Sequence, residues 1–401
     1  MLGMSREGAI ARVWRHMRLG LSVVATGILL SACATQLGGG GTMPPADEPV
    51  ASAPAADGQV RIGLVLPLTA QGNAGLAAQS MKNAAEMSLA EFKANNVQLL
   101  VKDDGGSPQG ARNAAEQAIA EGAEIIVGPL FAQSVSAVGQ VARPRNIPVI
   151  AFSTDASVAA RGVYLLSFLP ETDVRRIVAY SASRGKRSFA ALMPDNAYGT
   201  VVEAALQQEV ARHGGRVVVL EKYPHDANRT AEAVRRVAQA ANQIDSIFIP
   251  DSPDSVPQVV QALAANGVDL KRVQLLGTGL WSDDTRISSE KLLDGGWYPS
   301  PEQTGFRNFS GRYRARYGQD PVRTATLAYD AVALVAALVK TQGAQRFSQE
   351  ILTTPSGFSG IDGIFRFHSD GTNERGLAVL KVTPTGGQVV SPAPKSFQPG
   401  T

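Results

Sequence analysis

Residues 124–151 read EIIVGPLFAQSVSAVGQVARPRNIPVIA, and this stretch decides the fold. Residues 124–127 and 147–151 are short apolar runs that are typical of buried strands, and residues 134–143 between them have helical spacing. A strand, a helix and a second strand in this order predict two parallel strands that are joined by a crossover helix. The helix then covers one face of the sheet.

The same alternation continues outward in both directions. Toward the N-terminus, we expect strands at 60–66 and 97–101, with helices at 74–95 and after Pro108. A second series begins after Pro170, with expected strands at 188–192, 217–220, 244–249 and 273–276 and helices near 196–213, 230–242 and 256–265. Two such series predict an α/β protein with two Rossmann-like lobes, each an open parallel sheet that is covered on both faces.

The last hundred residues break the alternation. Two helical patterns follow each other at 303–317 and 323–341, and expected strands at 363–368, 376–383 and 388–390 come after them. The periodicity alone does not assign this part to either lobe.

The N-terminus has the pattern of an export signal. Arg12, Arg15 and Arg18 precede an apolar run at 19–30, which is too short to span a bilayer. The run ends in Leu30-Ser31-Ala32-Cys33, which resembles a bacterial lipobox and predicts cleavage of residues 1–32 and a lipid anchor on Cys33. The alternative is an ordinary signal followed by an incidental cysteine.

The anchor implies a location and a tether. Ala34 stands where an Asp would be the usual signal for retention at the inner membrane. By analogy, we therefore expect a periplasmic protein anchored to the outer membrane, with the inner membrane as the alternative. Residues 33–59 are rich in Gly and Pro, and we expect them to form a flexible tether, because they cannot bury a core.

Composition argues against several classes of function. Residues 1–32 hold four of the 38 basic residues and one of the 35 acidic ones, so the remaining chain has 34 of each. Such a balance gives no electrostatic basis for binding nucleic acid. With one Cys and four His, a multi-ligand His/Cys metal site is not expected. No complete catalytic or phosphate-loop motif is present, so we expect neither an enzyme nor a bound cofactor.

Loops that follow the expected strands are the candidate ligand site, because open parallel sheets bind ligands beyond the carboxyl ends of their strands. The candidate residues are Thr69, Gln71, Phe131, Gln133, Ser153, Thr154 and Asp155 in the first lobe and Tyr198, Asp251 and Trp281 in the second. Polar residues in these places also commonly cap the next helix. Ser134 and Asp195 look most like caps, whereas Phe131, Tyr198 and Trp281 are possible apolar walls of a ligand site.

Three stretches carry a family resemblance, namely residues 60–68, 125–149 and 193–199. Together with the architecture, they resemble the periplasmic leucine-binding-protein family over about residues 60–390. The resemblance implies three crossings between the lobes, near Pro170, Pro299 and 371–376. The lobes would then comprise residues 60–169 with 300–373, and 170–299 with 374–392, followed by a tail at 393–401.

A narrower resemblance covers residues 129–170 and MPDNAYG at 193–199. Both segments resemble lipoproteins grouped as penicillin-binding protein activators, which implies a non-enzymatic regulator whose partner is a peptidoglycan synthase. The alternative is the solute-binding component of an ABC importer for branched-chain or related amino acids, with a small polar ligand between the lobes.

The amino-acid contacts of the family are altered in this chain. The positions that hold the α-carboxylate align roughly with Ala132 and Asp155, and the acid that holds the ammonium group aligns near Gly279. An ionised Asp155 would repel a carboxylate. Asp155 is therefore expected to contact a cationic or hydroxyl-bearing ligand, or to cap the following turn.

Overall fold

The computed structural model describes residues 58–224 and 227–397. The expected signal at 1–32, the expected lipid anchor Cys33 and residues 34–57 of the expected tether lie outside the described residues.

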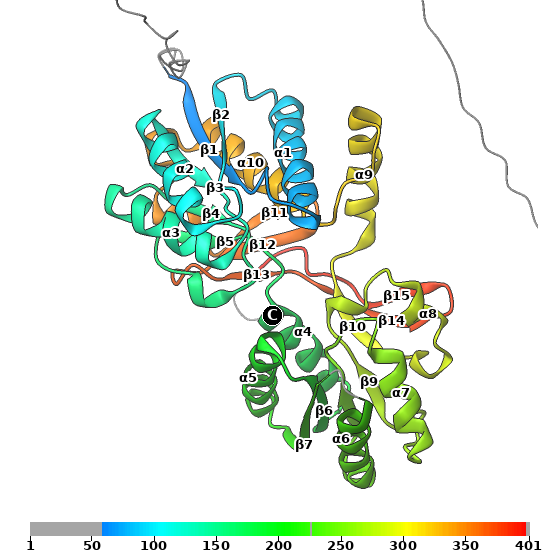
Figure 1. Ribbon diagram of the computed structural model, residues 1–401. Helices are drawn as coiled ribbons and strands as arrows, with labels where there is room; N and C mark the ends of the chain where they lie inside the picture. Colours follow the sequence, from blue (N-terminus) through cyan, green and yellow to red (C-terminus); the bar gives the residue numbers. More distant parts are fainter. Residues whose placement is uncertain (1–57, 225–226, 398–401) are drawn as a thin grey trace, which may run out of the picture. The chain divides into compact units, whose positions relative to one another are not determined.

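The first sheet has five parallel strands in the order β2-β1-β3-β4-β5 (Figure 1). They are β1 (Val60–Leu66), β2 (Val97–Asp103), β3 (Ala123–Val127), β4 (Val149–Ala151) and β5 (Val163–Leu165). Between them run α1 (Asn73–Phe92), α2 (Pro108–Ala120) and α3 (Ala132–Ala142). In β1, Ile62 and Leu64 pack with α1, whereas Val65 packs with α2 and α3. Alternate side chains of one strand thus hold helices on both faces.

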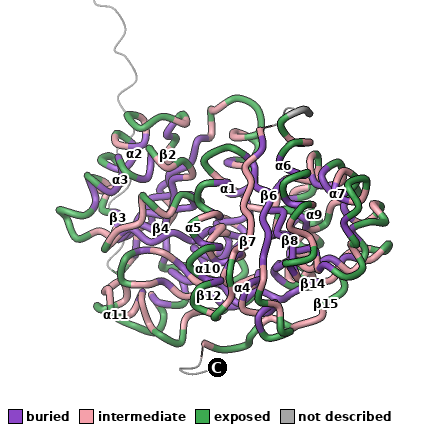
Figure 2. The backbone as a smooth tube through the Cα atoms, turned by 90° about the horizontal axis from the view of Figure 1, so that it is seen from below, coloured by how far each residue is buried: buried purple, intermediate pink, exposed green. Residues whose placement is uncertain are grey.

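The second sheet has seven strands in the order β15-β14-β10-β9-β8-β6-β7. Five of them are parallel, namely β6 (Ser188–Pro194), β7 (Arg216–Tyr223), β8 (Ser246–Phe248), β9 (Gln274–Leu276) and β10 (Trp297–Ser300). The helices of this part are α4 (Pro170–Ser183), α5 (Ala197–Arg212), α6 (Ala227–Gln239), α7 (Val256–Ala265) and α8 (Thr285–Ser289). In both sheets the buried residues are concentrated on the strands and on the helix faces that cover them (Figure 2).

The C-terminal part is divided between the two sheets. Helix α9 (Gln303–Tyr317) packs Phe309 and Tyr313 against Ala84 and Met87 of α1, and α10 (Ala325–Thr341) packs on the same helix. A short helix α11 (Gln349–Leu352) and a small antiparallel sheet follow, with β11 (Phe358–Gly360), β12 (Gly363–Phe367) and β13 (Asn373–Arg375). The last strands, β14 (Ala378–Thr383) and β15 (Gly386–Ser391), extend the second sheet in antiparallel fashion.

The chain passes between the two sheets three times, which confirms the predicted fold. It leaves the first sheet after β5 and enters α4 at Pro170, and it leaves the second after Ser300. It returns between Arg375 and Ala378. We call β1–β5, β11–β13, α1–α3 and α9–α11 the first lobe, and the remaining strands and α4–α8 the second lobe.

Strand β10 was not predicted from the sequence, and Pro299 is the reason. Proline cannot donate a ladder hydrogen bond, so it argues against a strand inside a sheet. In the structure β10 pairs with β9 only through Trp297, and Pro299 pairs with Val379 of β14. The strand therefore meets its parallel neighbour before the proline is reached.

Candidate functional site

The loops after β1, β2 and β3 meet at one end of the first sheet. The Thr69 hydroxyl donates to Asp103 at 2.6 Å, which joins the first two loops. A methyl group at Gly106 would lie 3.5 Å from both Ala70 and Phe131, so the third loop approaches the same point. Phe131 is 38% exposed, and Thr69, Gln71 and Gln133 are exposed beside it in the sequence.

The loop after β4 is stabilised by its own side chains. Ser153 is buried, and its hydroxyl accepts the Asp155 N–H at 3.1 Å. The Asp155 carboxylate accepts the Ser157 N–H at 2.9 Å and so caps the short 3-10 helix η2 (Ala156–Val158). Thr154 and Asp155 are both exposed. Capping was one of the two expectations for Asp155, and it leaves the second carboxylate oxygen free to accept another donor.

Two predicted caps are wrong. Ser134 lies inside α3, is buried and has no hydrogen-bond partner among the described residues, while Phe131 occupies the N-cap position. At the start of α5, Asn196 rather than Asp195 is the cap, because its side chain accepts the Gly199 N–H at 2.9 Å. Each prediction placed the helix start at the wrong residue.

Adjacent acids in the first lobe have opposite pKa shifts. Burial acts to raise the pKa of Asp103, but hydrogen bonds from Thr69 and Gly105 outweigh it and lower the pKa. Asp104 is buried, and one of its carboxylate oxygens has no partner among the described residues. Burial therefore raises the pKa of Asp104 in spite of the Gly106 N–H.

Polar side chains of the second lobe bond between elements that follow different strands. The Tyr198 hydroxyl lies 3.0 Å from the Thr278 hydroxyl. The Tyr223 hydroxyl donates to Asp251 at 2.6 Å, and the Ser252 N–H donates to the same carboxylate. Asp251 is only 5% exposed, so its contacts are mainly structural.

Trp281, which we considered a possible apolar wall of a ligand site, is almost fully buried. It is 1% exposed, its indole N–H donates to the Ile249 carbonyl at 3.2 Å, and its ring packs near Tyr298. A side chain at Gly277 would overlap this ring. Trp281 is a large apolar side chain in the loop after β9, and it packs into the core beneath that loop.

Asp173 is a site residue that the sequence analysis missed. It lies in the first turn of α4, is partly exposed, and accepts the Gly279 N–H at 2.8 Å. Burial raises the pKa of Asp173 to about 7, and the single Gly279 hydrogen bond only partly offsets this. Its charge also contributes to a raised pKa at Tyr198. Acids in a first helical turn are common, so no sequence pattern distinguishes this residue.

A second carboxylate of the same helical turn is also unpaired. Glu171 is partly buried, and one of its oxygens has no partner among the described residues. Burial raises the pKa of Glu171, although its own backbone N–H and the charge of Arg175 act to lower it, and the charge of Asp155 in the first lobe makes a smaller raising contribution. Asp155, Glu171 and Asp173 thus make the strand-end loops acidic where the chain passes from one lobe to the other. We call these three residues the acidic group.

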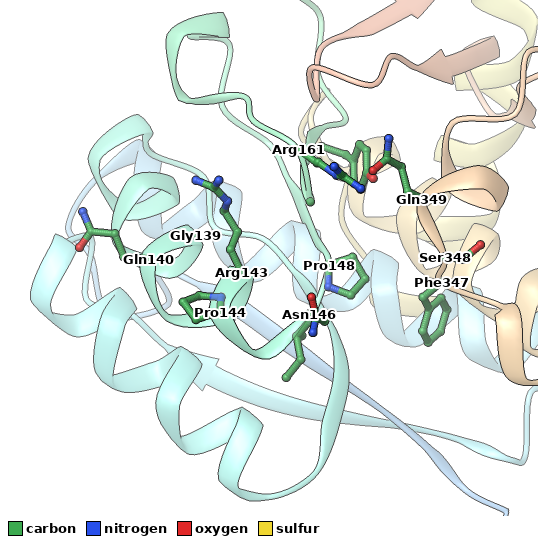
Figure 3. Close-up of a pocket in the computed structure, with 13 residues that line it drawn as sticks. Gly139, Gln140, Arg143, Pro144, Asn146, Pro148, Arg161, Phe347, Ser348 and Gln349 are labelled. Carbon is green, nitrogen blue, oxygen red and sulfur yellow. The ribbon is translucent and has the colours of Figure 1, made fainter.

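A separate cavity of about 610 Å³ lies at the amino ends of β4 and β5. Figure 3 shows Gln140, Arg143 and Pro144 on one side of it and Phe347, Ser348 and Gln349 on the other. None of the predicted ligand residues lines this cavity. It is therefore distinct from the strand-end loops.

Residues 58–224 and 227–397 contain neither a metal-binding cluster nor a membrane-spanning helix. No group of three or more His, Cys, Asp or Glu side chains is arranged to hold a metal ion. Among the same residues, every helix is too short or too polar to span a membrane.

Comparisons with known proteins agree with the fold. The Leu/Ile/Val-binding protein homolog 6 of Brucella suis is 22% identical over 229 residues, which are 55% of this chain and 58% of that protein. The penicillin-binding protein activator LpoA of Pantoea ananatis is 26% identical over 174 residues, 43% of this chain and 25% of that protein. Each match thus spans less than two thirds of the relative's length.

Solved structures and a family model extend over most of the chain. The crystal structure of a branched-chain amino acid ABC transporter protein from Rhodospirillum rubrum has a TM-score of 0.73 at 19% identity, covering 83% of this chain and 100% of that one. The family model described as periplasmic binding protein matches residues 59–388. The chain therefore belongs to the periplasmic binding protein family.

Proposed function

We propose that this protein is a non-enzymatic, periplasmic binding protein whose ligand carries a positive charge. The observation that supports the proposal is Asp173, a partly exposed carboxylate at the strand-end loops with a single hydrogen-bond donor and no cationic partner among the described residues. Partial removal of a carboxylate from water, without a cation beside it, costs free energy. A ligand ammonium group placed beside it would remove that cost.

The surroundings of Asp173 favour the same ligand chemistry. Glu171 lies two residues away on α4, and the charge of Asp155 acts on Glu171 from the first lobe. Thr69, Gln71, Gln133 and Thr154 add exposed polar groups at the ends of the first-lobe strands. Because like charges repel, a free carboxylate on the ligand would be disfavoured near Asp155.

Gly279 connects this proposal to the altered amino-acid contacts. A methyl group at Gly279 would lie 3.0 Å from the Asp173 carboxylate. Asp173 therefore occupies the neighbourhood in which the family resemblance implies an acid that this chain lacks at position 279. We propose that Asp173 is the ammonium-binding acid, supplied from α4 instead of from the loop after β9.

A ligand screen on the full-length chain tests the proposal. We expect diamines such as putrescine to raise the unfolding temperature, whereas L-leucine and benzoate, which carry a carboxylate, leave it unchanged. At 100 times the dissociation constant, a ligand stabilises the folded state by about 2.7 kcal/mol. Asp173→Asn should abolish the shift, and Asp320→Asn, which changes an exposed acid beyond α9, should retain it. A shift with leucine or benzoate and none with the cations would contradict the proposal.

A second candidate function is regulation of a peptidoglycan synthase by a protein anchored through Cys33. It is favoured by the match to the activator LpoA and by the segments at 129–170 and 193–199. Beads that carry the full-length protein should then retain a synthase from the same cell envelope and stimulate glycan polymerisation. A Cys33→Ser variant should leave the membrane fraction. A synthase that neither binds nor responds would leave the solute-binding role, with an importer permease as the partner.

A further inference from the structure

A basic pocket lies beside the third crossing. It has a volume of about 570 Å³ and includes residues of both lobes. Its charged and ionisable lining residues are Arg175, Arg176, Glu209, Arg212, His213, Arg366, Glu374 and Arg375. We call it the crossing pocket.

The crossing pocket lies on a different face of α4 from Asp173. Thr172, Arg175, Arg176 and Ala179 line the pocket, and their spacing places them on one helix face. Asp173 is rotated by roughly 100° from Thr172. Asp173 and the pocket arginines are therefore on different faces of α4, whereas Glu171 lies one turn from Arg175, whose charge acts on it.

Positive charge exceeds negative charge in this pocket by three, with His213 counted as neutral. The two acids are already shared among arginines. Glu209 is 3.5 Å from both Arg175 and Arg212, and Glu374 accepts two hydrogen bonds from Arg366, at 2.7 and 2.9 Å. Arg176 donates only to uncharged oxygens, the Leu377 carbonyl at 2.7 Å, the Ser391 hydroxyl at 2.7 Å and the Pro392 carbonyl at 3.4 Å.

Arg375 strengthens the positive potential from the wall of the pocket. It is 4% exposed, its Nε donates to the Ser167 carbonyl at 2.9 Å, and its other two nitrogens have no acceptor among the described residues. Its guanidinium lies 4.6 Å from the Phe168 ring centre. The neighbouring Asp362 is already bonded to Arg323 through both oxygens. The charges of Asp362 and Asp330 also act on Arg375 and offset part of its charge, so Arg375 adds less to the positive potential of the pocket than an unpaired arginine would.

We propose that the crossing pocket binds a small molecule bearing a multivalent phosphate group. Arginine side chains present paired N–H donors that match phosphate oxygens. Arg175 and Arg212 come from the second lobe and Arg366 from the first, so one bound phosphate would contact both sides of the third crossing. This inference is independent of the charge of the ligand at the strand-end loops.

Calorimetric titration of the full-length protein with sodium pyrophosphate, at constant ionic strength, tests the proposal. We expect saturable binding at one site, which weakens as sodium chloride is added. Arg212→Gln and Arg366→Gln should each weaken binding by about tenfold, which corresponds to about 1.4 kcal/mol. Arg314→Gln is the matched control, because Arg314 is an exposed arginine of α9 that pairs with Asp320 outside the pocket, and it should bind as the unaltered protein does.

A substitution of opposite sign separates binding from a structural role. Glu209→Gln removes a negative charge and keeps the shape of the side chain, so pyrophosphate should bind severalfold more tightly.

Vesicles of phosphatidylglycerol, compared with phosphatidylcholine, test whether the phosphate belongs to a lipid headgroup. Vesicle binding that Arg212→Gln and Arg366→Gln abolish would support that source. No saturable binding to either probe, or equal binding by all variants, would overturn the proposal.

Discussion

The strand-end loops of the two lobes satisfy their polar groups in different ways. In the first lobe, Asp155 bonds to the backbone two residues ahead, and Asp103 bonds to Gly105 and to the adjoining Thr69 loop. In the second lobe, Tyr223 reaches Asp251 and Asp173 reaches Gly279, over 28 and 106 residues of sequence. The loop after β4 in the first lobe thus supports itself, whereas the contacts of the second lobe form only when its separate elements are assembled.

This difference indicates where each lobe is sensitive to mutation. A loop that is supported by its own backbone loses little stability when one side chain is removed, because the turn itself remains. When one side chain of a hydrogen bond between separate elements is removed, its partner is left without a hydrogen bond. If that partner is buried, the free energy of unfolding falls. Substitutions in the second lobe should therefore have the larger effects.

Trp281→Ala should have the largest effect. It removes a fully buried ring from beneath the loop after β9, and we expect the free energy of unfolding to fall by about 3–5 kcal/mol. The matched change in the first lobe is Phe131→Ala, at a ring that is 38% exposed, for which we expect a loss below about 1 kcal/mol. Urea unfolding of both variants checks the pair. Similar losses would remove the contrast between the lobes.

Tyr223→Phe should follow in size. The change leaves a buried oxygen of Asp251 without its 2.6 Å donor, which we expect to cost about 1–3 kcal/mol in the free energy of unfolding. Tyr198→Phe is the control, because the lost contact is between two hydroxyl groups, Tyr198 and Thr278. A larger loss in the free energy of unfolding for Tyr198→Phe than for Tyr223→Phe would contradict this prediction, because the Tyr223–Asp251 hydrogen bond would then be the less important of the two contacts.

Asp173→Asn should stabilise the protein without ligand, in a pH-dependent way. The folded-state pKa of Asp173 is raised from 3.8 to about 7, so the wild-type protein loses stability as pH rises through this window. Asparagine can still accept the Gly279 N–H. Because the carboxylate is partly exposed, we expect a gain of about 1–2 kcal/mol at pH 8 and none below pH 4. Urea unfolding at both pH values measures this, and a less stable variant at pH 8 would show that the ionised form is favoured by a contact not identified here.

Asp155→Ala should have the smallest effect. It removes the cap of η2, and we expect a loss of about 0.5–1 kcal/mol in the free energy of unfolding. Asp195→Ala is the comparison, since Asn196 and not Asp195 caps α5, and it should be nearly neutral. A larger loss for Asp195→Ala would reverse our assignment of the two caps.

Much of the fold follows from local patterns. The strand at 60–66 and the helix at 256–265 have the limits that their apolar spacing predicted. The loops after the parallel strands were identifiable because parallel strands end at a common edge. Strand β10 was not predicted, because Pro299 argues against a strand at this place in the sequence. The strand forms by pairing with β14, about 80 residues later in the chain.

The site was only partly predictable for a related reason. Asp155 caps within its own loop, which a short sequence window reveals. Trp281 was a possible apolar wall of a ligand site, and in the structure it packs in the core of the second lobe, because burial depends on what lies below a loop. Asp173 looked like an ordinary acid at a helix start, and its importance comes from Gly279, which contacts it only in the assembled lobe.

The sequence by itself determined the two alternating strand and helix series, because apolar periodicity specifies which face of each element is buried. It also determined the chemical types present at the strand ends. Only the tertiary structure decided which carboxylates are left without a cation at those ends, and which arginines gather at the third crossing. The physical reason is that a pKa, or an unpaired charge, depends on neighbours in space, and these neighbours come from segments that lie far apart in the sequence.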